Sequence, residues 1–501
     1  MKIFKLWYIT GGLTMHYKEG KNRNQVMIGV SLNYFIDKNN PIRIIDAFIE
    51  NIVNSEPEEF KYKGQSNIGQ KAYSPKTFLK LYIYGYINGI TSSRKLEVAT
   101  KVNIEVKWLL GDLQPDFKTI ADYRKDNRRQ IDFVSKKIRE FLKQHKLIQG
   151  ELVAIDGTKV KANARRDMLN IKKIRKRLVK IDKRIDDYLE DIEINDLKDD
   201  IIEENEDLDS SSINRKLVKK IFEMQKKIER LKQAEEKLKQ SDKKQISMTD
   251  KDASLVKMKG GKVPGYNIQA AVDAKNMMIM GIYPTAAPVD INQIYPLVNH
   301  LEKEYNEVPE SITADKGYYN LNDITKIKLE KDIDFYTPLP NKKIYKEKIE
   351  FKYDKEKDEY ICSEGKSLKL IQKNKKHHGA IMDVYRCDDC DGCPRRGECT
   401  KSKYGRMKHR YRHQELRDDF KRKMRTKKAK KIVAKRKAIV EHVFGTIKYW
   451  MGQIPLKLRG LKKVGTEINI YATGYNIKRL INTDSIDSIL ENINKYDWKM
   501  A

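Results

Sequence analysis

Short apolar runs in the middle of the chain are rich in β-branched residues and are bounded by turn residues, a pattern typical of buried strands. The runs lie at residues 151–160, 266–273, 278–283, 311–314 and 335–338. Two of them carry an acid at the end of the apolar stretch, Asp156 in the first and Asp315 directly after the fourth. Residues 290–305 have a helical pattern. The middle of the chain is therefore predicted to form a mixed five-stranded sheet flanked by helices.

Helical periodicity dominates before and between these strands. Residues 40–145 are predicted to form successive short helices, one of which opens at Ser74-Pro75, a capping residue followed by proline. Residues 171–240 carry apolar positions at steps of three and four, which predicts an antiparallel helical hairpin. The acidic segment Asp186–Asp209, followed by a polar turn of three serines, separates its two halves. We expect this segment to be a solvated face or a loop.

The order of three consecutive strands, a helix, a fourth strand, a helix and a fifth strand is that of a ribonuclease-H-like (RNase-H-like) fold. We predict an α/β core of this fold with an N-terminal all-helical domain, a helical-hairpin insertion and a Cys-rich insertion. The predicted boundaries are 1–14 (an upstream extension or start-site artefact), 15–148 (helical domain), 149–165 and 250–340 (core), 166–249 (hairpin), 341–412 (Cys-rich insertion) and 413–485 (C-terminal part of the core).

The net charge of the chain indicates which class of partner it binds. The chain has 103 Lys and Arg against 71 Asp and Glu, a net charge of +32. A surface this positive attracts polyanions, and release of counterions would drive much of the binding. No stretch approaches the roughly 20 apolar residues of a spanning helix. We therefore expect a cytoplasmic, nucleic-acid-binding protein without a membrane partner.

Three acids are candidates for a metal site. Asp156 and Asp315 end buried strands, and Glu441 lies on a predicted helix beside Gly445, which leaves room next to it. Carboxylate oxygens suit hard cations, and a pair of Mg²⁺ ions about 3.5–4 Å apart can drive cleavage and joining of phosphodiester bonds. Each acid also has a simpler interpretation, since Asp before Gly is a common turn and Glu between lysines commonly forms an i, i+4 ion pair.

The five cysteines fall together, in the spacing Cys387-x2-Cys390-x2-Cys393-x5-Cys399 with Cys362 upstream. This spacing indicates a structural zinc site with four thiolate ligands, for which Cys362 is an alternative ligand. Unligated, reduced cysteines are the alternative.

Basic residues beside these elements are candidates for contacts with DNA phosphates. Lys421–Lys437 holds eleven basic residues and no acid, and it leads directly to Glu441. Arg124 and Lys125 belong to short helices that are compatible with a helix-turn-helix reader of double-stranded DNA. A helical bundle with a solvated basic face is an equally good interpretation of those helices.

Linked blocks of the chain resemble the DDE transposases of bacterial insertion sequences, specifically the insertion-sequence-1182 group. The resemblance runs from about residue 15 to 480 and rests on motifs that include Pro115-Asp-Phe-Lys-Thr-Ile-Ala-Asp-Tyr-Arg-Lys, Ala154-Ile-Asp-Gly-Thr-Lys, Pro264-Gly-Tyr-Asn-Ile-Gln-Ala-Ala-Val-Asp, Ala314-Asp-Lys-Gly-Tyr and Val440-Glu-His-Val-Phe-Gly-Thr-Ile-Lys. It implies that Asp156, Asp315 and Glu441 are a catalytic triad for two Mg²⁺ ions, with Mn²⁺ as a substitute. It also implies an N-terminal domain that helps to bind the element's ends, a homodimer on DNA and a bacterial, nucleoid-associated location.

One part of the family signature is incomplete. Related enzymes carry Tyr-x2-Arg-x3-Glu-x6-Lys around the glutamate. Here Glu441 and Lys448 match, whereas Ala434 and Lys437 replace the Tyr and Arg, and Arg436 is one residue out of register. We expect Arg436, Lys437 and Lys448 to contact DNA. The alternatives are a domesticated or inactive relative that only binds DNA, and a nuclease without strand transfer.

Overall fold

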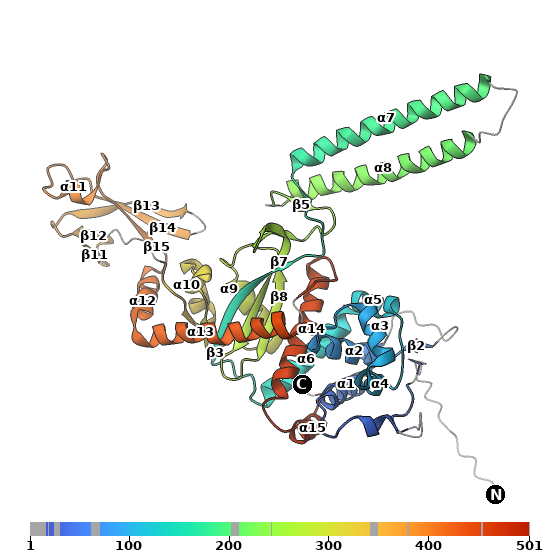
Figure 1. The fold of residues 1–501 in the computed structure, drawn as a ribbon. Helices are drawn as coiled ribbons and strands as arrows, with labels where there is room; N and C mark the ends of the chain where they lie inside the picture. The colour runs from blue at the N-terminus through green and yellow to red at the C-terminus, as the bar shows by residue number, and fades with distance from the viewer. Residues whose placement is uncertain are drawn as a thin grey trace, which may run out of the picture.

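The computed structural model describes residues 17–18, 20–24, 31–61, 71–201, 210–241, 243–340, 349–377, 380–451 and 454–499. It is a mixed α/β structure in which a helical body packs against a central sheet, and a long helical arm and a second, smaller sheet extend from them (Figure 1). None of the described helices is long and apolar enough to cross a membrane.

The five predicted strands form the central sheet. Its strands include β3 (Leu152–Lys161), β7 (Gly261–Asp273), β8 (Ile279–Thr285), β9 (Ser311–Thr313) and β10 (Asp334–Tyr336). The order β10-β9-β3-β7 continues to β8, which pairs with the outer edge of β7. β7 runs antiparallel to both β3 and β8, whereas β9 and β10 run parallel to β3. Asp156 was expected to end its strand but lies in the middle of β3, because β3 continues to Lys161 along β7. The parallel ladder between β3 and β9 ends at Ala154 and Thr313, so Asp156 and Asp315 each follow that ladder by two residues.

The sheet has six strands rather than the predicted five. The additional strand, β6 (Ser254–Met258), pairs antiparallel with the first residues of β7. β7 begins at Gly261, five residues before the predicted start at Tyr266. This extension reaches past the end of the β3 ladder, and its residues 261–265 pair with β6. Gly260 and Gly261 adopt positive φ values of 93° and 119° at the connecting turn.

The helical body consists of short helices, as predicted. They are α1 (Ile42–Ser55), α2 (Pro75–Ile87), α3 (Ser93–Val102), α4 (Ile104–Leu110), α5 (Phe117–Asp126) and α6 (Arg128–Gln144). The Ser74 side chain accepts a hydrogen bond from the Lys76 amide and caps α2. The helix predicted at 290–305 begins later, as α9 (Ile294–Tyr305), and α10 (Leu321–Lys331) precedes β10.

The C-terminal helices join the helical body to the sheet. α14 (Leu461–Leu480) packs against α2, α6 and β8, while α13 (Lys427–Gly445) lies across β3 and β7 (Figure 1). Buried side chains from Leu32 to Trp498 consequently form one continuous hydrophobic core. The N-terminal helices are thus part of the same packed unit as the sheet.

The arm is the predicted helical hairpin, formed by α7 (Ile171–Ile201) and α8 (Ser210–Lys239). The segment 186–201 continues α7 as helix, α8 starts at the serines where a turn was predicted, and residues 202–209 lie outside the described part. The Cys-rich insertion is an antiparallel sheet of β11 (Phe351–Asp354), β12 (Glu359–Cys362), β13 (Ser367–His377), β14 (Ala380–Arg386) and β15 (Met407–Tyr411).

Candidate active site

Asp156 and Asp315 lie close enough for their charges to interact. Asp156 is in β3, and Asp315 caps the short helix η3 (Lys316–Tyr318) after β9 by accepting a hydrogen bond of 2.7 Å from the Gly317 amide. Burial raises the pKa of Asp156, and the charge of Asp315 raises it further, while Arg436 and the Gly157 amide oppose the change. The structure therefore brings together two of the three predicted acids.

Arg436 neutralises Asp156 from the helix that crosses the sheet. Its Nη1 atom is 3.2 Å from Asp156 Oδ2, and both side chains are mostly buried, with 17% and 25% of their surface exposed. Lys448, which follows α13, is also close enough to Asp156 for their charges to interact. Partial burial lowers the pKa of Lys448, and the charge of Asp156 opposes this change. Arg436, which is out of register with the family signature, thus supplies the guanidinium at this site.

Glu441 is not gathered with the two aspartates. It lies on α13, 64% of its side chain is exposed, and its partner is Lys437 at 3.8 Å, the i, i+4 pair that was the simpler interpretation. A Cβ atom added to Gly445 would meet nothing within 4 Å, so the space predicted beside Glu441 is open. Within the described ranges, no group of three or more His, Cys, Asp or Glu residues is arranged to hold a metal ion. The donor chemistry of Asp156 and Asp315 fits a hard divalent cation, but this arrangement does not complete the triad.

A polar layer that the sequence did not reveal lies on the other face of β3. Gly157 and Lys159 pair with Gln269 and Asn267 of β7, so these residues share the face opposite Asp156. The Asp290 carboxylate accepts hydrogen bonds from Lys159 Nζ (3.0 Å), Asn267 Nδ2 (2.7 Å) and Gln269 Nε2 (3.0 Å).

This layer connects the segments that carry the two aspartates. The Tyr318 hydroxyl, on the helix that Asp315 caps, donates a 2.5 Å hydrogen bond to Gln269 Oε1. A Cβ atom at position 157 would lie 2.6 Å from Gln269 Nε2 and closer still to Asp290 Oδ1. Gly157 is therefore required by close packing inside a strand rather than by a turn, and the glycine after Asp156 was the only signal of this in the sequence.

Arg124 and Lys125 were both predicted to contact DNA, but they differ in their exposure to solvent. Arg124 is 3% exposed and donates hydrogen bonds to the Tyr86 hydroxyl and the Thr91 carbonyl, both at 3.0 Å. The prediction for Arg124 is wrong, because a guanidinium enclosed between α2, α3 and α5 cannot reach a phosphate. Lys125 is half exposed, pairs with Asp122 and Asp126 at 3.6 and 3.4 Å, and stays a predicted contact.

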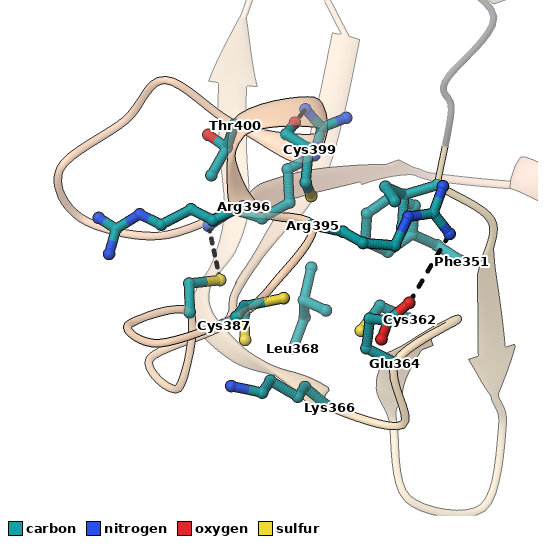
Figure 2. A pocket seen from close by; sticks show the side chains of 14 residues that line it. Phe351, Cys362, Glu364, Lys366, Leu368, Cys387, Arg395, Arg396, Cys399 and Thr400 are labelled. Carbon is teal, nitrogen blue, oxygen red and sulfur yellow. Dashed lines mark hydrogen bonds and ion pairs between the residues drawn. The ribbon is translucent and has the colours of Figure 1, made fainter.

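The five cysteines surround one small recess of about 20 Å³ in the Cys-rich sheet. Figure 2 shows Cys362, Cys387 and Cys399 around it, together with Leu368 and Phe351. Burial raises the pKa of Cys387 to about 12, assisted by the neighbouring Cys390 thiol. The cysteines are free thiols that converge without the close grouping of a metal site, so the zinc site stays a prediction.

Two family models match the chain. A model described as a transposase DDE domain matches residues 361–481, which include Glu441 and the five cysteines, and a transposase domain model matches residues 30–126. These matches support a DDE-type transposase. Assignment to the insertion-sequence-1182 group and a bacterial origin go beyond them.

A solved transposase structure has a weak similarity to this chain. The chain aligns with a piggyBac transposase determined by cryo-electron microscopy as a synaptic complex with hairpin DNA, at 12% identity over 92% of this chain and 85% of that one. The TM-score is 0.23, too low for the alignment to support an argument about the fold. No curated protein matches the chain.

Proposed function

We propose that this protein is a transposase of RNase-H-like fold that binds the ends of an insertion sequence as a homodimer, cuts there and joins the freed 3′ end to target DNA. The observation that carries the proposal is the pair Asp156 and Asp315, each two residues beyond the end of the parallel ladder between β3 and β9 and close enough for their charges to interact. The strand order and directions agree with the RNase-H-like arrangement. A soluble, nucleoid-associated bacterial protein fits this function.

The side chains have distinct roles in this proposal. Asp156 and Asp315 would hold the divalent cations, two Mg²⁺ or Mn²⁺ ions, which would polarise the attacking oxygen and stabilise the leaving one. Arg436 balances the charge of Asp156, and Lys437 and Lys448 bind backbone phosphates. Glu441 is the third ligand by resemblance to the family, and it must leave its ion pair with Lys437 to act.

The test is cleavage of a duplex carrying one end of the element, with added Mg²⁺. Asp315→Asn is expected to reduce the rate at least 10³-fold, an order of magnitude typical of lost metal or charge stabilisation. Asp332→Asn is the matched control, because Asp332 is an exposed residue at the end of α10 with a φ of 49°, which Asn also adopts readily. Equal cleavage by the two variants would refute the assignment of Asp315.

A relative that only binds DNA is the second candidate, and the position of Glu441 outside the aspartate pair favours it. The two candidates differ in one measurement. Glu441→Gln abolishes cleavage if the triad forms on DNA, whereas a protein that only binds DNA shows no Mg²⁺-dependent product in any form. Products cut but never joined would identify a nuclease.

A further inference from the structure

A basic recess of about 970 Å³ adjoins the candidate active site. It lies between the end of β3 and the segment that follows α13. Its positively charged lining residues are Lys159, Lys161, Arg165, Lys259, Lys448 and Arg459, and no acidic side chain is among the described residues that line it. Lys448 is also close enough to Asp156 for their charges to interact, so the recess adjoins that site. Such a lining attracts an anionic chain.

Two exposed aromatic side chains lie on the segment that borders the recess. Tyr449 lines the recess and is 86% exposed, and the next residue, Trp450, is 75% exposed with Lys478 Nζ 5.9 Å from its ring centroid. Both belong to a single π-helical turn, Thr446–Trp450, that directly follows α13. π-helical turns are rare and frequently mark functional sites, and exposed aromatic rings offer faces on which bases can stack.

We propose that this recess binds an unpaired strand of DNA, with its phosphates on the lysines and arginines and a base stacked on Tyr449 or Trp450. The inference rests on the proposed function and adds which form of DNA the site holds. The volume is at the upper end of the range for small-ligand pockets, about 300–1,000 Å³, so the recess has room for a nucleotide. Paired bases stack on each other and cannot reach an aromatic side chain, whereas unpaired bases can.

The test compares two forms of one fluorescein-labelled duplex, blunt and carrying an unpaired 3′ tail of about 4 nucleotides. With full-length protein, the tail is expected to tighten binding about tenfold, as stacking of one base would. A variant with both Tyr449→Leu and Trp450→Leu loses this gain and keeps its affinity for the blunt duplex, while the corresponding phenylalanine variant keeps both. Equal affinity of the wild-type protein for the two duplexes, or a gain that survives in the leucine variant, overturns the proposal.

Trp450 supplies a second, direct signal. The other tryptophans in the described part of the chain, Trp108 and Trp498, are 2% and 4% exposed. Quenching of tryptophan fluorescence by an oligothymidine strand is therefore expected to fall markedly in Trp450→Phe. The same quenching in wild type and variant would overturn the role of Trp450.

The experiments distinguish a failure of the proposed recess from a failure of the proposed transposase function. A preference for the tailed duplex without Mg²⁺-dependent cleavage supports the recess and refutes the transposase. Cleavage that depends on Asp315, without a preference for the tail, refutes the recess alone.

Discussion

The surroundings of a charged residue, more than its type, decide what it does in this protein. Arg124 and Lys125 are consecutive, yet only Arg124 is enclosed, where it bonds to Tyr86 and offsets the fully buried Glu467. Glu467 in turn accepts hydrogen bonds from the Lys457 and Leu458 amides. The arginine therefore neutralises a buried carboxylate at the junction between α5 and α14.

Replacing Arg124 is expected to destabilise the fold. Arg124→Met removes the guanidinium that donates to the Tyr86 hydroxyl, which in turn donates to Glu467, and losing a buried hydrogen bond of a charged group costs about 1.5–3 kcal/mol of unfolding free energy. Lys125→Met, the adjacent control at a half-exposed side chain, is expected to change stability little. Urea denaturation of the two variants measures the difference, and similar midpoints would contradict the structural role of Arg124.

Glu50 gives the stability of the helical body a dependence on pH. Burial opposes its ionisation, but the charges and hydrogen bonds of Lys80 and Lys76 outweigh burial and lower its pKa to about 2. A carboxyl group with a lowered pKa stabilises the fold above its unfolded value of about 4.3, and this contribution disappears as the pH falls toward 2.

The corresponding variant is Glu50→Gln. Because the side chain is 35% exposed, solvent screens the pair, and we expect a loss of about 1–2 kcal/mol at pH 7 that vanishes near pH 2. Unfolding free energies measured from pH 7 to pH 2 test this, with the exposed Glu58→Gln as control. A difference from wild type that does not change with pH would contradict the assignment.

Strand β3 is the element on which the site depends, because it presents Asp156 on one face and the polar layer on the other. Its ladder with β7 fixes which side chains meet, and the Asp290, Gln269 and Tyr318 hydrogen bonds tie it to the helix that Asp315 caps. The ladder between β3 and β9 and these hydrogen bonds on the opposite face of the sheet both hold the segments that carry the two aspartates.

Gly157→Ala tests this dependence. A methyl group there displaces Asp290 and Gln269, so the proposed cleavage is expected to fall well over tenfold, since small displacements at a reacting centre can cost about 10²-fold. Gly445→Ala, whose added carbon meets nothing within 4 Å, is the control and is expected to unfold no more easily than wild type. Full activity of Gly157→Ala would show that the layer does not position Asp156.

The whole molecule combines one shared core with parts that project from it. The helical body and sheet share buried side chains through α14, whereas the arm has a separate hydrophobic cluster that includes Ile174, Leu231 and Leu238. At the base of the arm, β4 (Met168–Leu169) pairs with β5 (Ile246–Ser247), which brings the two ends of the arm together. The arm is therefore removable in principle without exposing the main core.

Deleting residues 171–244 and joining the ends with a short Gly-Ser turn is expected to leave the rest folded. The deletion leaves the main core intact and exposes only Leu169 and Ile246 of the buried residues in the arm's cluster, and the ends meet in an antiparallel ladder whose strands are about 5 Å apart. Calorimetry and circular dichroism of the shortened chain should show one cooperative transition near that of the full chain, with less helix. Loss of that transition would show that the arm contributes to the main core.

The sequence by itself determined the local features of this protein, because they depend on neighbouring residues. Apolar runs predicted the five strands, capping residues predicted helix starts such as Ser74, and the three-four periodicity predicted the arm. The match of transposase family models agrees with the resemblance seen in the motifs. The triad roles and the zinc site stay predictions.

Only the tertiary structure decided which residues meet across long separations. The enclosure of Arg124, the approach of Arg436 rather than Lys437 to Asp156, and the exposure of Glu441 depend on how α2, α5 and α13 pack. The sequence predicted Asp290 as the start of a helix. In the structure its carboxylate accepts a hydrogen bond from Lys159 and lies beside Gly157. The burial of a side chain and its electrostatic partners depend on contacts between residues far apart in the sequence. The periodic patterns of strands and helices relate only residues two to four positions apart, so they cannot predict these contacts.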